Sequence, residues 1–272
     1  MSDSKASLDV NLTLVGGPTL LIEIAGLRLL SDPTFDPPSR YESGSIVLEK
    51  TAGPAITAEE IGPVDAVLLS HDQHFDNFDR AGRAFAANVK TVFTTPSGAR
   101  RLGKNAKGLA SWETATIDGK AGTRLSVTAT PARHGPAGFE PISGEVAGFV
   151  VGVSKPGDAK PGDHKPGDAI YLTGDTVWYE GVAEVARRFR PRLVVVFAGA
   201  AKPRGPFRVT MDDNDAIETA RAFPQARIIA IHNHGWKHFT ETQEDAVRAF
   251  TALGISARLQ TLELGKALHL QV

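Results

Sequence analysis

A predicted buried strand that leads straight into a cluster of histidines and carboxylates is the strongest constraint on how this chain folds. The apolar run at 64–69 predicts the strand, and residues 79–87 have helical character. Between them lies Ser-His-Asp-Gln-His-Phe-Asp-Asn-Phe-Asp at 70–79. This polar cluster therefore occupies a strand-to-helix turn at the carboxyl end of a strand, where open α/β sheets bind ligands. Its imidazoles and carboxylates suit zinc, manganese or iron.

Three later predicted strands also end at residues that commonly bind metals. His134 follows the strand expected at 124–130, Asp175 follows that at 169–172, and His232 follows that at 227–231. A solvated polar loop would account for the first cluster alone, but not for four strand ends with the same chemistry. The chain contains no cysteine, which excludes disulfides and thiolate ligands. A metal site would therefore use His, Asp, Asn and water.

Composition narrows the class of protein further. With 272 residues, 42% of them hydrophobic and 22% charged, the chain can form one large α/β domain with a sizeable core. The net charge of -1 gives no indication of a nucleic-acid partner. The most apolar stretch, 20–30, is too short to span a bilayer, and the first residues lack a signal pattern, so a cytoplasmic location is expected. Ser70 and Ser97 lie in no nucleophile-elbow motif, which argues against a serine hydrolase.

The other predicted elements alternate between strands and helices. Strands are expected at 9–15, 18–24, 27–30, 91–94, 146–153, 193–197, 259–264 and 268–272, and helices at 96–102, at 180–188 and from residues 210 and 240 onward. Thr240 with Gln243 has the spacing of a capping box. The Pro- and Gly-rich segments 33–54 and 199–208 are expected to be loops near the site. Three tandem Lys-Pro-Gly-Asp units within 155–168 predict an expanded hairpin loop with an exposed His164.

The order His-x-x-His-x-Asp, then His, then Gly-Asp, then His resembles the metallo-β-lactamase superfamily. Within it, the chain is most similar to the branch around ascorbate-6-phosphate lactonase and N-acyl-phosphatidylethanolamine phospholipase D. The resemblance runs from residues 19–24 to the last strand. It implies that residues 1–272 form a single domain, an αββα sandwich of two mixed β-sheets packed face to face with helices outside. Pattern alone would indicate only one α/β domain.

The resemblance also implies a function and a set of ligands. It implies a hydrolase that uses hydroxide on one or two Zn²⁺ ions, with Mn²⁺ or Fe²⁺ as alternatives, to cleave a small phosphoester, phosphodiester, lactone or amide. Asp32 would hold the loop that carries the first ligands in place without binding the metal itself. The implied catalytic residues are Asp76, Asp175 and His238. The implied ligands are His71, His74 and His134 for the first metal, Asp76, Asn77 and His232 for the second, and Asp175 between them.

The first motif departs from the family pattern His-x-His-x-Asp-His in two places. One extra residue separates the histidines, so a gapless match would place Asp72 in the first ligand position. His71 is preferred because it follows Ser70 at the strand end, as the family's first His follows Ser or Thr. Asn77 stands where the last His belongs, and an amide oxygen is a much weaker zinc ligand than an imidazole. The second site would therefore be weak, rearranged or filled only with substrate present.

Several further residues have two interpretations. His234 and His238, which flank Trp236, are either supporting histidines or groups that contact substrate or transfer a proton. Lys202 and Arg204 either bind a phosphate or carboxylate or are simply solvated. The expected partner is a small-molecule substrate, and a homo-oligomer is compatible with the sequence. The alternative function is a metal-binding sensor or interaction module of the same fold with little or no hydrolytic activity, because Asn77 weakens the second site.

Overall fold

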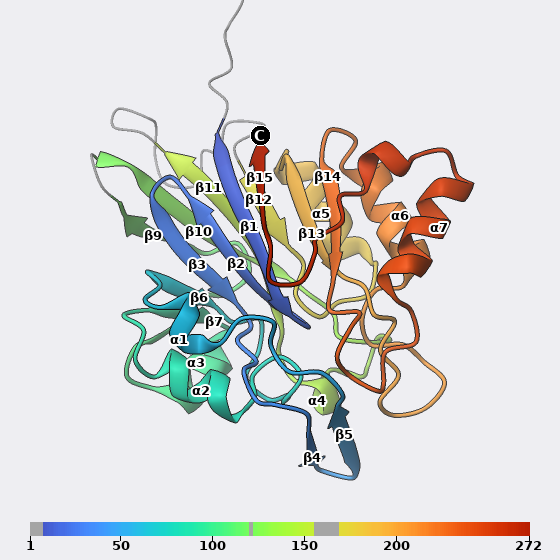
Figure 1. Ribbon diagram of the computed structural model, residues 1–272, viewed down its shortest axis with the longest axis horizontal. Coiled ribbons are helices and arrows are strands. Elements are labelled where there is room, and N and C mark those ends of the chain that lie inside the picture. Colours follow the sequence, from blue (N-terminus) through green and yellow to red (C-terminus); the bar gives the residue numbers. More distant parts are fainter. Residues whose placement is uncertain (1–7, 120–121, 155–168) are drawn as a thin grey trace, which may run out of the picture.

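Two β-sheets and a separate hairpin form the framework of the protein (Figure 1). The computed structural model describes residues 8–119, 122–154 and 169–272. The Lys-Pro-Gly-Asp units and His164 lie outside these residues. Among the described helices, none combines the length and the apolar character that crossing a membrane requires.

The first sheet has seven strands in the order β15-β1-β2-β3-β6-β7-β8. Strands β15 to β3 pair antiparallel, whereas β3, β6, β7 and β8 run parallel. The carboxyl ends of β3 and β6 therefore meet at one edge. The strands are β1 (Asp9–Gly16), β2 (Thr19–Ile24), β3 (Leu27–Ser31), β6 (Ala66–Leu68), β7 (Val92–Thr94), β8 (Ala106–Gly108) and β15 (Ala267–Gln271).

The second sheet has six strands in the order β14-β13-β12-β11-β10-β9. Strands β12, β13 and β14 run parallel, and the others pair antiparallel. Its strands are β9 (Thr114–Asp118), β10 (Arg124–Pro131), β11 (Ala147–Ser154), β12 (Ala169–Leu172), β13 (Leu193–Phe197) and β14 (Arg227–Ile231).

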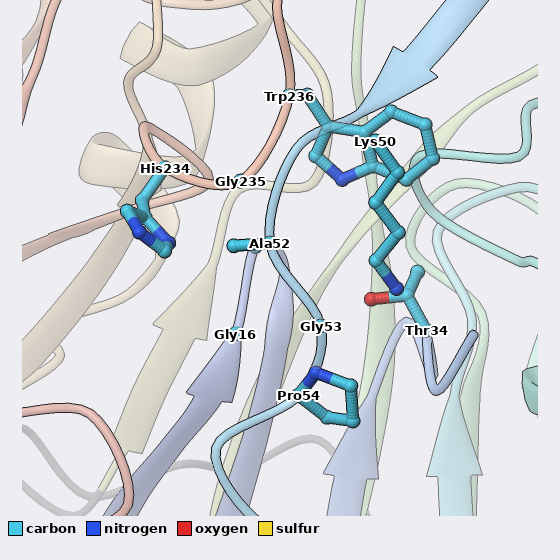
Figure 2. Close-up of a pocket in the computed structure, with 10 residues that line it drawn as sticks. Gly16, Thr34, Lys50, Ala52, Gly53, Pro54, His234, Gly235 and Trp236 are labelled. Carbon is cyan, nitrogen blue, oxygen red and sulfur yellow. The ribbon is translucent and has the colours of Figure 1, made fainter. Parts of the chain in front are cut away.

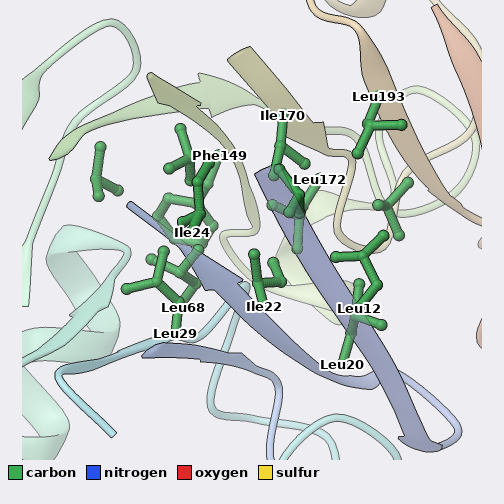
Figure 3. Packing of buried hydrophobic residues seen from close by; sticks show 14 of the residues in the cluster. Leu12, Leu20, Ile22, Ile24, Leu29, Leu68, Phe149, Ile170, Leu172 and Leu193 are labelled. Atoms are coloured by element: carbon green, nitrogen blue, oxygen red, sulfur yellow. The ribbon is translucent and has the colours of Figure 1, made fainter. Parts of the chain in front are cut away.

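The alternation of side chains along β13 illustrates how the layers are held together. Leu193, Val195 and Phe197 point into the core between the two sheets, part of which is drawn in Figure 3. Val194 and Val196 point the other way, into a second apolar cluster under the helices. Because successive side chains of a strand face opposite sides, a strand covered on both faces is apolar throughout. All five residues of β13 are buried.

Helices cover the outer face of each sheet, which confirms the predicted αββα sandwich (Figure 1). Apolar residues of α1, α2 and α3 pack against the first sheet. Those of α5, α6 and α7 pack against the second, and α4 is a single turn near the candidate site. The helices are α1 (Ala58–Ile61), α2 (Arg80–Ala86), α3 (Pro96–Leu102), α4 (Glu140–Ser143), α5 (Glu180–Arg188), α6 (Asp213–Ala222) and α7 (Gln243–Ala252).

The segment 33–54, expected to be a loop, contains a β-hairpin. Strands β4 (Ser39–Ser43) and β5 (Ile46–Lys50) pair antiparallel and form a sheet of their own. Tyr41 and Leu48 are cross-strand partners, and both are buried against Trp236. The partner that buries these apolar residues lies near the other end of the chain, so local composition concealed the hairpin.

The C-terminal elements also differ from expectation. Residues 259–264 do not form a strand; Leu259 and Leu264 make only isolated bridges, to Ile228 and Leu14. The last helix is capped by Thr242 with Asp245, a capping box two residues later than the expected one. Helix α6 begins at Asp213, three residues after the expected start at residue 210.

Asp79 fixes the loop that carries the first candidate ligands. Its carboxylate caps α2 by accepting from Gly82 N (2.8 Å) and also accepts from the backbone N–H groups of Phe35 (3.0 Å) and Asp36 (2.8 Å). Lys50 Nζ donates to it at 2.9 Å, with both side chains buried. The Lys50–Asp79 pair thus joins β5 to the segment after β3 and to the end of the loop that carries the candidate ligands.

Replacing Asp79 by Ala should destabilise the fold strongly, because the buried Lys50 ammonium loses its partner and α2 loses its cap. We expect the free energy of unfolding to fall by about 3–5 kcal/mol in urea denaturation, the usual loss when one member of a buried pair is removed. Asp118→Ala is the matched control: its pair with Arg124 is exposed, so its loss should be within about 1 kcal/mol. Equal losses in the two variants would contradict the structural role of Asp79.

Candidate metal centre

The candidate metal centre forms where four strands end. His71 and His74 follow β6, His134 follows β10, Asp175 follows β12 and His232 follows β14. The backbone at His232 is left-handed (φ 57°), an uncommon conformation for a non-glycine residue. Its N–H donates to Gly17 O at 3.0 Å, a contact that joins β14 to the turn after β1. Such strained positions concentrate at functional sites.

Three imidazoles converge on one point. His74 Nδ1 lies 2.9 Å from His71 Nε2 and 3.1 Å from His134 Nε2. The Val209 carbonyl can only accept, so His134 Nδ1, 2.7 Å away, carries the proton and Nε2 is left with a lone pair. One proton on His74 can bridge to only one of its two neighbours. A cation shared by the three nitrogens satisfies all of them.

Two of these imidazoles, those of His71 and His74, are held in their neutral form. Burial, together with the neighbouring His74, holds the pKa of His71 well below its usual range. Burial and then His134 lower the pKa of His74 to about 4. Both side chains are therefore uncharged at neutral pH, and a metal would not have to displace protons from them.

Asp76, Asp175 and His232 form a second group, whose ligand atoms all lie within 4.8 Å of one another. His232 Nε2 is 3.4 Å from Asp175 Oδ1 and 3.9 Å from Asp76 Oδ2. The other oxygen of Asp175, Oδ2, lies 3.6 Å from His134 Nε2. Asp175 therefore faces both groups, one oxygen toward each.

The charge of this second group is not balanced by a cationic side chain. Burial would raise the pKa of Asp76, but His238 and the other nearby histidines hold that pKa well below its usual range. For Asp175, His232 and His134 likewise outweigh burial and lower the pKa. Within the described part of the chain, neither carboxylate pairs with a lysine or arginine. Two buried carboxylates thus face only imidazoles and the amide of Asn77.

Several buried polar atoms at the centre lack hydrogen-bond partners among the described residues. They are Asp76 Oδ1, Asn77 Oδ1, both ring nitrogens of His232 and His238 Nδ1. Unpaired buried polar atoms are rare in folded proteins and indicate a role or a missing ion or water. Imidazole nitrogens and carboxylate oxygens are also the ligands that zinc and related ions prefer. The residues present therefore fit one or two divalent ions.

The structure brings His71, not Asp72, to the other histidines. Asp72 forms a two-point ion pair with Arg101, with contacts of 2.8 and 2.5 Å. Its carboxylate is thereby occupied by a guanidinium. Asp32, expected behind the metal loop, accepts from Ser70 N at 2.7 Å. It thus holds the backbone directly before His71.

Asn77 and His238 both contact the second group. Asn77 Nδ2 donates to Asp175 Oδ1 at 3.3 Å, and its side chain is fully buried. His238 Nε2 lies 2.9 Å from Asp76 Oδ2. His234, in contrast, is exposed and belongs to neither group. It lines a cavity of about 10 Å³ beside Trp236, which holds at most a single water (Figure 2).

An apolar pocket opens above the first group. It has a volume of about 30 Å³, with His74, Asp76 and His134 among its lining residues. The rest of its wall is Ser43, Ile46, Leu48, Phe139, Ile142, Ser143, Pro203, Arg204 and Val209. Arg204 reaches the tip of the β4–β5 hairpin, donating to Ser45 Oγ at 2.9 Å. The segments 33–54 and 199–208, expected to be loops near the site, supply Ser43, Ile46, Leu48, Pro203 and Arg204 of this wall, whereas the pairing of β4 with β5 was not predicted.

Two larger cavities lie nearby. A groove of about 560 Å³ shares His134 with the pocket, and α4 lines both, with Glu140 and Pro141 in the groove and Ile142 and Ser143 in the pocket. A second, of about 410 Å³, is lined by Lys202, Arg133 and Arg208 together with Asp212 and Glu241. Lys202 thus faces a different cavity from the one that Arg204 lines.

Comparisons with known proteins agree with this architecture. UPF0173 protein YddR of Bacillus subtilis (strain 168) is 23% identical over 267 residues, which cover 95% of this chain and 99% of that protein. The isothiocyanate hydrolase from Delia radicum gut bacteria superposes with a TM-score of 0.78 at 23% identity, over 96% of this chain and 100% of that one. A chain described as a possible metal-dependent hydrolase from Veillonella parvula DSM 2008 gives 0.77 at 19% identity, over 95% and 98%.

A family model described as a beta-lactamase superfamily domain matches residues 27–233. The match begins at β3 and ends one residue beyond His232, so it includes both groups of candidate ligands. Since the family model covers most of the chain, this protein belongs to the beta-lactamase superfamily.

Proposed function

We propose that this protein is a metal-dependent hydrolase of a small molecule that carries an apolar group beside the bond it cleaves. The observation that carries the proposal is the position of the candidate ligands. Six ligand-type side chains lie together, and three of their residues, His74, Asp76 and His134, line an apolar pocket. Small-molecule sites typically combine such an apolar wall with a few polar groups.

We assign the first ion to the three histidines and the second to Asp76 and His232, with one oxygen of Asp175 for each. The supporting observations are the short nitrogen–nitrogen distances at His74 and the contacts of Asp175 with both groups. Zn²⁺ is the first candidate, and Mn²⁺ or Fe²⁺ suit the same nitrogen and oxygen ligands. An ion bound here would lower the pKa of a bound water molecule, and it would neutralise charge that develops on the substrate.

The remaining side chains position the substrate. Ile46, Leu48 and Phe139 offer contacts to an apolar tail, and Val209 both lines the pocket and holds His134 through its carbonyl. Arg204 is the one cationic side chain among the described residues of the wall, and it already donates to the hairpin. The lining therefore favours an uncharged carbon electrophile, such as a lactone, an amide or an isothiocyanate, over a phosphoester.

A panel of probes tests this proposal. The zinc-loaded protein should release benzylamine from benzyl isothiocyanate, or open an apolar lactone, faster than it hydrolyses bis-p-nitrophenyl phosphate. The isothiocyanate is included because one solved structure of this fold is named for that activity. Preference for the phosphodiester would overturn the proposed substrate class. No turnover of any probe by protein with bound zinc would favour the sensor alternative.

His74→Ala should remove metal from the first site, because His74 Nδ1 lies between the other two ring nitrogens. The zinc affinity of that site should fall by more than the ~10- to 100-fold typical of losing a supporting residue. Isothermal titration of metal-free protein with Zn²⁺, with elemental analysis of the purified variant, measures the change. His234→Ala is the control, since that imidazole is exposed and outside both groups. Unchanged zinc content in His74→Ala would refute the assignment.

Ile142→Ala should affect substrates with apolar tails selectively. Ile142 lines the pocket but is 57% exposed, so the fold should tolerate its truncation. We expect kcat/KM for benzyl isothiocyanate to fall about three- to tenfold, from ~1 kcal/mol of lost apolar contact, and that for methyl isothiocyanate to change little. Leu253→Ala, at 50% exposure far along the chain, is the matched control. Equal losses for the two substrates would show that Ile142 does not contact the tail.

A further inference from the structure

We propose that His238 binds the second metal ion and supplies the imidazole that the first motif lacks at Asn77. The inference rests on the proposed function, since it assumes that the second group holds an ion. It adds a ligand from the segment after β14, which lies beyond the residues that the family model matches.

The position of the imidazole is the first argument. His238 Nε2 lies 2.9 Å from Asp76 Oδ2, the oxygen that also lies 3.9 Å from His232 Nε2. The two imidazoles thus reach the same carboxylate oxygen of the second group. The His238 side chain is 8% exposed, so its ring is directed inward rather than into solvent.

The chain holds His238 firmly in this place. Its carbonyl accepts from Lys202 N at 3.0 Å, and its ring lies edge-on to Phe239 with centroids 4.8 Å apart. The ring centroid of Trp236 lies 6.0 Å from that of His238, and Trp236 is itself buried against Tyr41. A ligand needs such support, because metal geometry tolerates little movement.

Ligation would change the tautomer of His238. Its Nε2 lies 2.9 Å from the Asp76 carboxylate, which can only accept, so the ring proton lies on Nε2 when no ion is bound. Nδ1 has no hydrogen-bond partner among the described residues, so no contact there prevents the proton from moving to Nδ1. With the proton on Nδ1, the lone pair of Nε2 points toward the second group, as ligation requires.

Asn77 has a different task in this arrangement. Its Nδ2 donates to Asp175 Oδ1 at 3.3 Å. An amide binds a metal through its oxygen, and Asn77 Oδ1 has no partner among the described residues, but it is a much weaker zinc ligand than an imidazole. Asn77 thus orients the carboxylate that faces both groups, and in this proposal the imidazole comes from the far end of the chain.

The competing interpretation is that His238 only donates a hydrogen bond to Asp76, or moves a proton, without touching the ion. His238→Gln separates the two, because a glutamine amide can still donate to Asp76 but is a much weaker zinc ligand than imidazole. We expect metal-free His238→Gln, titrated with Zn²⁺ by calorimetry, to keep the affinity of the first site. Its second site should bind about tenfold or more weakly. In the Co²⁺-loaded protein, the visible spectrum of the second ion should change.

Asn77→His in the His238→Gln background should restore tight binding of the second ion, because it returns an imidazole to the same corner. His234→Ala is the matched control and should bind both ions as the wild type does. Unchanged second-site affinity and an unchanged Co²⁺ spectrum in His238→Gln would overturn the inference, even if the double variant fails to fold. Wild-type protein that binds no zinc would instead overturn the proposed function itself.

Discussion

Two buried carboxylates that pair with no lysine or arginine among the described residues are the constraint on which the rest of the site depends. Removing a carboxylate from water costs several kcal/mol unless an opposite charge or good hydrogen bonds compensate. Asp76 and Asp175 are both buried, and the groups around them are imidazoles and one amide. The nearby histidines hold the pKa of both side chains below its usual range, so both carboxylates are ionised at neutral pH.

Other buried carboxylates in the same protein are treated differently. Asp79 has Lys50, and Asp72 has Arg101, each at hydrogen-bonding distance. Both pairs lie in or beside the loop that carries His71 and His74, so they give that loop a fixed shape. Asp72 and Asp79 thus have cationic side chains as partners and stabilise the fold. Asp76 and Asp175 have no such lysine or arginine partner among the described residues.

Sequence alone was sufficient for strand ends that depend on neighbouring residues. The apolar run of β12 followed by Asp175, and that of β14 followed by His232, are local patterns, and the strands end as predicted. Features set by distant contacts were not predictable in this way. The pairing of Tyr41 and Leu48 depends on Trp236. The choice between His71 and Asp72 depends on Arg101.

His238 shows the same limit most clearly. Its contact with Asp76 joins residues 162 positions apart, and no spacing rule links them. The resemblance to metallo-β-lactamases implied a role for His238 but could not indicate its neighbour. The extra residue in the first motif and the amide at Asn77 looked like defects when only nearby positions were compared. In three dimensions an imidazole lies beside the second group after all.

The β4–β5 hairpin is attached to the body of the protein by contacts different from those that hold the metal ligands. Its two strands form a sheet of their own (Figure 1). At the base, Lys50 bridges to Trp236 and pairs with Asp79, and Tyr41 packs on Trp236, whereas Arg204 holds the tip. Residues at and beside its tip can therefore change in size and polarity without moving a strand end. The tip of the hairpin is thus the part of the pocket wall that can vary apart from the ligands, so related chains can diverge in the molecules they accept while keeping one reaction chemistry.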